Sequence, residues 1–309
     1  YPQWYKKNGG KILSTTIDKY VYLSFRELPP YFGYKYRIVW SKVENEKNLK
    51  NIKHNVVRKI FPFMKISRGI ELHYQADLPA RSGLGSSSSF VVGLLNIISK
   101  YKKLNFSKYK LANKSIFFEK EILKEYVGIQ DQISASIGGF NKIDIKKSGN
   151  FNIKNIKFQK SISKLNKNLV LVFTGINRTA SEIAGNYVSS LNSSKEKEMR
   201  EIMSQVDEGE KLLKKGYYDD FGRLLNESWK YKKSLSNIIS NKRIDNLYNY
   251  FMKNGALGGK LLGAGGGGFM VFYLPISKQK KFVQNNKDIK FVPFNFTNEG
   301  SKIIFNEND

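Results

Sequence analysis

The sequence predicts an α+β protein built from two closely packed lobes. Strand patterns come first along the chain, helical patterns dominate its middle, and strands mixed with helices follow. This order favours segregated strands and helices over a regular alternation of the two. With 309 residues, the chain is long enough to bury one large core or two. Because no long linker interrupts it, we place the boundary near residue 165, between an N-terminal lobe (1–165) and a C-terminal lobe (166–309).

Strand patterns open the N-terminal half. The segment that starts at Tyr1 enters quickly into a strand pattern. Aromatic and β-branched residues alternate with polar ones over residues 11–26 and 34–40, which predicts antiparallel strands. Residues 69–79 carry another strand pattern, which Pro79 ends because proline cannot donate a ladder hydrogen bond.

Helical patterns follow and extend into the second half. A largely buried helix is expected over 90–101 and another over 106–125, and residues 128–140 predict a loop, a short helix and a Gly-Gly stop. The near-continuous apolar strand at 168–175 is typical of a sheet covered on both faces. The remaining expected elements are mostly helical structure over 180–235, a helix over 242–255 and a strand over 269–274.

Composition narrows the class of protein. Hydrophobic residues make up 40% of the chain, and no apolar run approaches the roughly 18 residues that span a bilayer. There is no cysteine and no leader-like start, so we expect a soluble, cytoplasmic protein without a membrane partner. The formal charge of +27 comes from lysines scattered over the chain. Such a field would steer a negatively charged small substrate, and nucleic-acid binding is the less favoured interpretation.

Glycines and serines stand directly before the helix that follows Pro79. The stretch reads Gly83, Leu84, Gly85, Ser86, Ser87, Ser88. Glycine allows close approach of the backbone, and the N–H groups and dipole of a helix start favour anions. The stretch therefore predicts a phosphate cradle, although a serine-rich N-cap after a flexible turn would look similar. It is not a Walker loop, because the required lysine is absent.

A second glycine cluster, GAGGGG over residues 263–268, stands between a helix stop and an apolar strand. Consecutive glycines cost conformational entropy, so close approach to a ligand or to another backbone explains them better than a turn with a bulge.

Two carboxylates complete the candidate chemistry. Asp131 stands in a glycine-bounded loop or helix start, where it could face a pocket, and Glu119 on the preceding helix could ligate Mg²⁺. From spacing alone, Asp131 and Glu119 could also be ordinary acidic side chains on the solvent-exposed surface.

Other catalytic arrangements are excluded by what the chain lacks. Two histidines, His54 and His73, without any cysteine argue against a zinc site or a Ser-His-Asp triad.

Taken together, these motifs resemble the GHMP small-molecule kinases. Their central motif, Pro-x3-Gly-Leu-Gly-Ser-Ser, is matched from Pro79 to Ser87, the acidic motif by GIQDQ at 128–132, and the glycine motif by KLLGAGGGGFMVFY at 260–273. Within the family, the similarity is greatest to the heptose 7-phosphate kinases and covers nearly the whole chain. The resemblance implies a ribosomal-protein-S5-like N-terminal lobe and a ferredoxin-like C-terminal lobe. It implies ATP- and Mg²⁺-dependent phosphorylation of the anomeric hydroxyl of D-glycero-D-manno-heptose 7-phosphate, for nucleotide-heptose and surface-glycan biosynthesis.

The resemblance also assigns roles to individual residues. Asp131 would orient or deprotonate the sugar hydroxyl, while Ser87 and Glu119 would hold Mg²⁺, with Ser86 as an alternative to Ser87. The backbone from Gly83 to Ser88 would bind the phosphates of ATP. Arg178 would bind the sugar's 7-phosphate, unless it forms a surface ion pair, because its planar fork suits phosphate oxygens. The glycines expected to close the site near the substrate are Gly265, Gly266, Gly267 and Gly268.

One segment of the family pattern is missing. Family members begin with a strand and a glycine-rich substrate motif, and this chain starts at Tyr1, just after the place where that segment would end. Losing a core strand would expose apolar surface and destabilise the fold. We therefore expect the sequence to be trimmed from a longer protein. If the strand is truly absent, activity is in doubt and a protein that binds ATP without turnover is the alternative.

Two further alternatives stay open from the sequence. The acceptor could be an unphosphorylated sugar such as fucose or galactose, or the chain could be a basic nucleic-acid-binding protein whose affinity falls steeply with salt. The sequence does not fix the anomer or the adenine contacts. It also leaves the oligomeric state open, a homodimer included.

Overall fold

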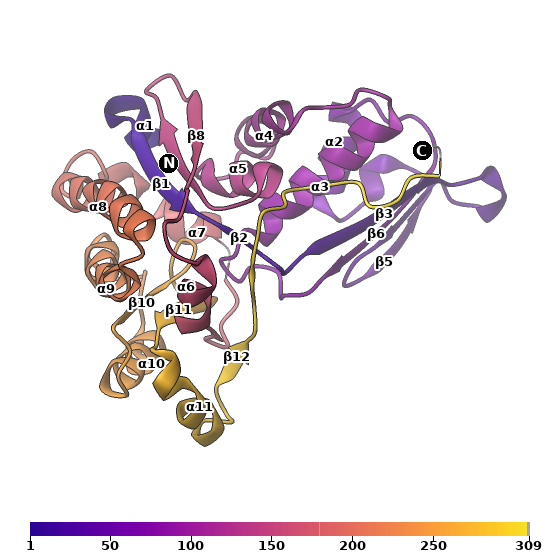
Figure 1. Ribbon diagram of the computed structural model, residues 1–309. Helices are drawn as coiled ribbons and strands as arrows, with labels where there is room; N and C mark the ends of the chain where they lie inside the picture. The colour runs from indigo at the N-terminus through magenta and orange to yellow at the C-terminus, as the bar shows by residue number, and fades with distance from the viewer. Residues whose placement is uncertain (179, 308–309) are drawn as a thin grey trace.

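The computed structural model describes residues 1–178 and 180–307 and has two lobes (Figure 1). The larger sheet of the first lobe contains β3 (Val21–Glu27), β4 (Tyr36–Val39), β5 (Val43–Glu46) and β6 (Ile70–Ala76) in the order β3-β6-β4-β5. The β3–β6 and β4–β5 pairs are antiparallel, as predicted, but β4 and β6 are parallel. The difference arises because the chain leaves β5 through a helix, α2 (Asn55–Phe63), and returns along the other side of β4.

A smaller sheet joins the start of the chain to its middle. Strands β1 (Gly10–Ser14), β7 (Asn141–Ile145) and β8 (Phe151–Asn155) form an antiparallel sheet in that order. Strand β1 is preceded by a helix, α1 (Pro2–Asn8), where the sequence had predicted strand character. Proline is favourable in the first turn of a helix, and α1 buries Trp4 and Tyr5.

Helices cover the first lobe's sheets and carry its motifs. These are α3 (Ser86–Tyr101), α4 (Lys108–Phe117), a π-helical turn (Phe118–Ile122) and α5 (Gln130–Ile137). Helix α3 starts at Ser86, four residues before the expected start, so the serines form its first turn. Its apolar residues, among them Val91, Leu95 and Ile98, are fully buried in the core between the helices and the larger sheet.

The second lobe confirms the predicted ferredoxin-like arrangement. Its antiparallel sheet has the order β10-β11-β9-β12, which in chain order is the 2-3-1-4 pattern of a split βαβ fold. The strands are β9 (Leu169–Phe173), β10 (Gly258–Leu261), β11 (Phe269–Tyr273) and β12 (Lys290–Val292). The helices and short turns are α6 (Ile162–Asn168), α7 (Ala180–Gly185), a 3₁₀ turn (Val188–Ser190), α8 (Glu196–Lys215), α9 (Tyr218–Ser234), α10 (Lys242–Lys253) and α11 (Ile276–Asn285).

The core of this lobe is rich in aromatic side chains. Phe251 of α10 stacks on Phe272 of β11, with ring centroids 3.9 Å apart, beside the fully buried Trp229 of α9. The boundary expected near residue 165 falls inside α6, which leads directly into β9. It stays a prediction.

The C-terminal segment returns to the first lobe, as the yellow trace in Figure 1 makes plain. Strand β13 (Phe296–Thr297) pairs with β2 (Thr16–Ile17), and the Ser301 amide then donates to the Ala135 carbonyl of α5 at 2.7 Å. The backbone here leaves no room for a side chain, since a Cβ on Gly300 would collide with the backbone of α5. The end of α5 is therefore held by a segment remote in sequence.

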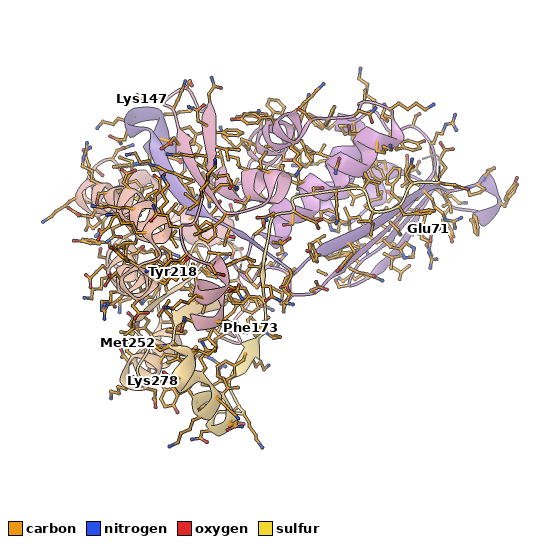
Figure 2. All side chains as sticks on the ribbon, in the orientation of Figure 1. Glu71, Lys147, Phe173, Tyr218, Met252 and Lys278 are labelled. Atoms are coloured by element: carbon orange, nitrogen blue, oxygen red, sulfur yellow. The ribbon has the colours of Figure 1, made fainter. Side chains whose placement is uncertain are left out.

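Charged side chains surround both lobes (Figure 2). Lys147, between β7 and β8, and Lys278, on α11, are exposed and lie at widely separated places. This spread agrees with the scattered lysines of the sequence. Among residues 1–178 and 180–307, no helix has both the length and the apolar character needed to span a membrane.

Candidate active site

The glycine-serine loop ends at the start of α3. Gly83 and Gly85 have φ angles of +84° and +72°, a region that side chains disfavour, and Gly85 is the N-cap of the helix. Among residues 1–178 and 180–307, no side chain caps this helix start, so the serines do not act as an N-cap. The first N–H groups of a 16-residue helix are consequently left without an intrahelical or capping partner. They provide donors and a dipole suited to phosphate.

The second glycine loop packs directly on the first. A Cβ on Gly83 would lie 2.8 Å from the Leu262 carbonyl oxygen, and the Phe269 amide donates to the Ser82 carbonyl at 3.1 Å. Both clusters therefore need glycine partly because their backbones touch. The predicted substrate glycines Gly265, Gly266 and Gly267 face apolar neighbours. Cβ atoms at these positions would lie 2.8, 2.9 and 2.6 Å from atoms of Ile239, Ile183 and Ile176, respectively.

Glu119 lies in the π-helical turn and is 1% exposed. One carboxylate oxygen, Oε2, accepts hydrogen bonds from Ser88 Oγ at 3.1 Å and from Gln132 Nε2 at 2.6 Å. The other oxygen, Oε1, is buried and has no partner among the described residues. Burial raises the pKa of Glu119 to about 8, against the opposing hydrogen bonds from Ser88 and Gln132.

The structure thus brings Ser88, and not Ser87, to Glu119. Ser87 is exposed, and no hydrogen bond joins it to Glu119 in the part of the chain that the structure describes. The assignment of Ser87 to a metal ion stays a prediction, and Ser88 becomes a second candidate.

Asp131 is the second residue of α5 and lies against the phosphate loop. A Cβ on Gly85 would be 3.4 Å from both the Cβ and the Cγ of Asp131. Burial raises the pKa of the Asp131 carboxyl, while the Arg178 charge and a hydrogen bond with Gln130 oppose this rise. The predicted catalytic carboxylate therefore stands beside the predicted phosphate site.

Arg178 follows β9 and contacts both glycine loops. Its amide donates to the Arg81 carbonyl at 3.1 Å, and its Nε donates to the Gly265 carbonyl. Its Nη2 is buried without a hydrogen-bond partner among the described residues. The alternative of a surface ion pair does not describe this half-buried side chain.

Sequence reasoning missed two residues of this region. Gln132 donates to Glu119, and Lys232 of α9 donates to the carbonyl oxygens of Leu261 and Gly263 at 2.7 and 2.6 Å. Burial, followed by the charges of nearby Lys260 and Arg178, lowers the pKa of Lys232. Gln132 stands inside the acidic motif and could have been found there. Lys232 lies in a lysine-rich helix with no local signal to mark it.

The donor set fits a magnesium ion that shares its coordination with a nucleotide. Among the described residues, no cluster of three or more carboxylate, histidine or cysteine ligands exists. Mg²⁺ commonly binds through one or two carboxylates while water and substrate phosphates complete its shell. The unpartnered Oε1 of Glu119, close to the phosphate loop through Ser88, is such a ligand.

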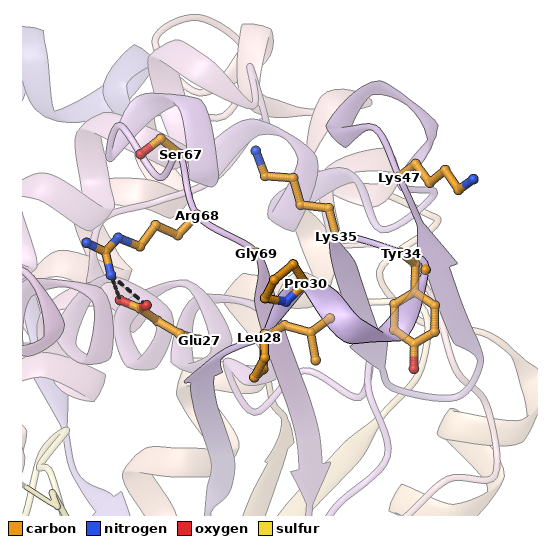
Figure 3. A pocket seen from close by; sticks show the side chains of 11 residues that line it. Glu27, Leu28, Pro30, Tyr34, Lys35, Lys47, Ser67, Arg68 and Gly69 are labelled. Atoms are coloured by element: carbon orange, nitrogen blue, oxygen red, sulfur yellow. Dashed lines mark hydrogen bonds and ion pairs between the residues drawn. The ribbon is translucent and has the colours of Figure 1, made fainter.

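Two hollows lie away from these loops. One, of about 780 Å³, is lined by residues between Glu27 and Gly69, including Lys35 and Arg68 (Figure 3). It opens at the start of β6, whereas the phosphate loop follows the end of that seven-residue strand, about 20 Å away at ~3.3 Å per residue. The other, of about 470 Å³, is lined by Pro2, Gln3, Lys6 and Lys7 of α1. Neither contains a residue of the glycine loops.

Comparison with known proteins adds a family to this geometry. Residues 49–139 match the family model described as GHMP kinases N terminal domain, and residues 210–285 match GHMP kinases C terminal. Over 303 residues, the chain is 31% identical to a D-glycero-alpha-D-manno-heptose 7-phosphate kinase from Campylobacter jejuni, covering 96% of this chain and 85% of that protein.

Two further similarities extend this picture. An L-fucokinase/L-fucose-1-P guanylyltransferase from Bacteroides fragilis is 28% identical over 209 residues, which cover 65% of this chain but 22% of that protein. A crystal structure of a D-glycero-D-manno-heptose 1-phosphate kinase from Bacteroides thetaiotaomicron has a TM-score of 0.77 at 23% identity, covering 98% of this chain and 93% of that one. At this identity, the structural similarity establishes the fold.

Proposed function

The chain belongs to the GHMP kinase family, and from this premise we propose that it transfers the terminal phosphoryl group of ATP to the anomeric hydroxyl of D-glycero-D-manno-heptose 7-phosphate. The product is the 1,7-bisphosphate, a precursor for nucleotide-activated heptose and surface glycans. The choice of acceptor rests on the similarity to the heptose 7-phosphate kinase, which spans both glycine loops and the acidic motif. The structural observation that supports phosphoryl transfer is the contact of Asp131 with Gly85.

The phosphate loop binds the triphosphate of ATP through its backbone. The donors are the N–H groups over residues 83–88, supported by the dipole of α3. Leu84 contributes its amide and holds the spacing between the two glycines. Magnesium, when bound, neutralises charge on the phosphate oxygens. Glu119 would hold it from the protein side together with Ser87 or Ser88, and Gln132 fixes the orientation of the Glu119 carboxylate.

Asp131 orients the acceptor hydroxyl and takes up its proton. The carboxylate stands next to the phosphate loop, where an incoming hydroxyl would face the terminal phosphate in line. The backbone over Gly265–Gly267 closes the site beside the acceptor. Arg178 has two candidate partners, the 7-phosphate of the acceptor and the terminal phosphate of ATP.

The test is ADP release with ATP, Mg²⁺ and a panel of acceptors. The panel contains D-glycero-D-manno-heptose 7-phosphate, the same heptose without phosphate, fucose and galactose. Turnover that requires the phosphorylated heptose supports the proposal. Turnover that prefers fucose supports the second candidate, which the similarity to the Bacteroides fragilis fucokinase favours. Nucleotide binding without turnover on any sugar would reject both acceptors while leaving the family assignment intact.

A further inference from the structure

We propose that Arg178 is a catalytic residue that contacts the terminal phosphate of the bound nucleotide, and that it does not bind the 7-phosphate of the sugar. The inference deepens the proposed function and rests on it. Three independent features of Arg178 carry it: the way its backbone is tied, the position of its unpartnered nitrogen and its charge beside Asp131.

The segment that carries Arg178 is fastened to both glycine loops. The Arg178 amide donates to Arg81 before the phosphate loop, and the Gly268 amide donates to the Ile176 carbonyl at 2.8 Å. At the side chain, Nε donates to the Gly265 carbonyl. Because backbone and side chain are both held, the guanidinium has little freedom to swing toward a distant group.

The free nitrogen of Arg178 lies between the two loops. Its Nη2 is 3.1 Å from where a Cβ on Gly83 would stand and 2.6 Å from where a Cβ on Gly263 would stand. The two glycines thus leave the space that this nitrogen occupies. A buried guanidinium nitrogen without an acceptor is costly, and phosphate oxygens are its best geometric match. One of the two loops beside Arg178 Nη2, the loop that contains Gly83, is the one proposed to hold the nucleotide phosphates.

Charge and chemistry place the same group at the reaction centre. Burial raises the pKa of the Asp131 carboxyl, and Arg178 is close enough for its charge to oppose that rise. In the transfer, the acceptor oxygen loses its proton to Asp131 and forms the new P–O bond as the bond to the ADP oxygen breaks. Arg178 keeps its charge throughout and offsets the charge on the phosphoryl oxygens. The sugar's own phosphate sits on C7, which the ring oxygen, C5 and C6 separate from C1, so it is a group distinct from the phosphoryl group that is transferred.

Two ratios separate the two roles of Arg178. The first is the affinity for a non-hydrolysable ATP analogue relative to ADP, measured by calorimetry with Mg²⁺. The second is kcat/KM for heptose 7-phosphate relative to the unphosphorylated heptose. Arg178→Ala and Arg178→Lys are compared with the wild type and with Arg243→Ala. Arg243 is a matched control because it is an exposed arginine that packs against Gly175 of the same segment.

We expect Arg178→Ala to reduce the nucleotide ratio about 10-fold and kcat about 10²- to 10³-fold, with the acceptor ratio unchanged. Arg178→Lys should restore part of kcat, and Arg243→Ala should leave both ratios unchanged. Loss of the acceptor ratio with an intact nucleotide ratio would overturn the proposal and return Arg178 to the 7-phosphate. Two intact ratios with a lowered melting temperature would make it structural. If no sugar is phosphorylated even by the wild type, the proposed function fails while the nucleotide ratio still decides the role of Arg178.

Discussion

A Cβ atom on Gly263 would stand 2.6 Å from the Cα of Gly83, so the backbones of the two glycine loops meet directly. One loop begins the helix of the first lobe that carries the serines, and the other joins two strands of the second lobe. The candidate site is therefore assembled by contact between the lobes. Each glycine loop forms one side of the candidate site, so neither loop alone would enclose it.

Gly263→Ala should disrupt this contact. Its φ of +70° disfavours alanine, and the added methyl would press on Gly83 and Arg178. We expect a loss of about 2–4 kcal/mol in the free energy of unfolding and a large loss of ATP affinity, measured by urea denaturation and calorimetry. Gly33→Ala is the control, since Gly33 also has a φ of +70° but no atom of the described residues lies within 4 Å of the added carbon. It should cost about 1 kcal/mol and leave ATP affinity intact; equal losses in the two variants would contradict the packing explanation.

Asp131→Asn should abolish transfer without abolishing nucleotide binding. The amide keeps the shape of the side chain but cannot accept the acceptor's proton, so kcat should fall roughly 10²- to 10⁴-fold. Burial raises the pKa of Asp131, so removing its charge should leave the melting temperature unchanged or raise it. Asp288→Asn, at an exposed position before β12, is the control. Near-normal kcat in Asp131→Asn would remove this residue from the chemistry.

Glu119 should make the folding stability of the nucleotide-free protein depend on pH. Its pKa is about 8 in the folded protein and has an ordinary value of 4.5. Between these values, the folded protein holds a proton that the unfolded chain has released. The free energy of unfolding therefore falls as pH rises through this window, by up to about 1.4 kcal/mol per pH unit. Urea denaturation at pH 5, 6, 7 and 8 should give a flatter profile for Glu119→Gln. The profile of exposed Glu121→Gln should match the wild type, and parallel profiles for all three proteins would reject the assignment.

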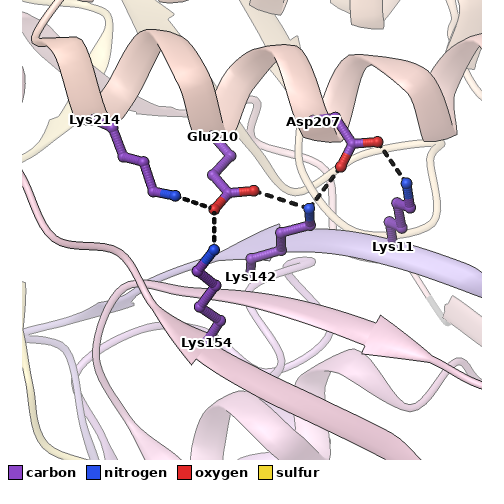
Figure 4. A network of polar contacts seen from close by, with 6 residues as sticks. All are labelled: Lys11, Lys142, Lys154, Asp207, Glu210 and Lys214. Atoms are coloured by element: carbon purple, nitrogen blue, oxygen red, sulfur yellow. Dashed lines mark hydrogen bonds and ion pairs between the residues drawn. The ribbon is translucent and has the colours of Figure 1, made fainter.

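A network of ion pairs joins the small β1-β7-β8 sheet to α8 (Figure 4). It consists of Asp207 and Glu210 with Lys11, Lys142, Lys154 and Lys214. Glu210, with a side chain 10% exposed, accepts from Lys142 at 2.8 Å and pairs with Lys154 at 3.2 Å and with Lys214. The hydrogen bonds from these lysines lower the pKa of Glu210 to about 2. We expect Glu210→Gln to lower the free energy of unfolding at pH 7 by about 2 kcal/mol, between the values for exposed and buried pairs.

The pH dependence of this cluster has the opposite sign to that of Glu119. Its stabilisation is present above pH 4.5 and is lost as pH falls toward 2, so wild type and Glu210→Gln should converge in acid. Asp220→Asn is the control, because Asp220 and its partner Arg223 are 56% and 60% exposed. It should cost less than about 1 kcal/mol. A difference in the free energy of unfolding between wild type and Glu210→Gln that stays constant down to pH 2.5 would contradict the assignment of this pH dependence to Glu210.

Much of the fold and of the site could be predicted from the sequence, because both depend on local signals. Alternation and apolar runs gave β3, β6 and β9, and the glycine clusters marked both loops. The hydrogen bond between Ser88 and Glu119 was not predicted, because it depends on helix phase, and the assignment of Ser87 to the metal, with Ser86 as its alternative, stays a prediction. With α3 starting at Ser86, Ser88 shares a buried face with Val91 and Leu95, which follow it at helical spacing, and Ser87 points outward.

Other features depend on contacts between distant parts of the chain. The start of the chain reads as a strand, but packing of Trp4 against the second lobe favours helix α1. Nothing local marks Lys232, because its partners are carbonyl oxygens that the fold brings to it. The same holds for Arg178, whose neighbours come from both glycine loops.

The return of the C-terminal segment to the first lobe has a consequence for synthesis on the ribosome. The helix that carries Asp131 accepts a hydrogen bond at Ala135 from Ser301, and β2 pairs with Phe296 and Thr297. A nascent chain that has made the whole first half still lacks these partners. Contacts of such long sequence separation slow folding and leave strand edges exposed until they close. The helix that carries Asp131 therefore gains its bond to Ser301 only after synthesis has passed residue 301, long after the helix itself has been made.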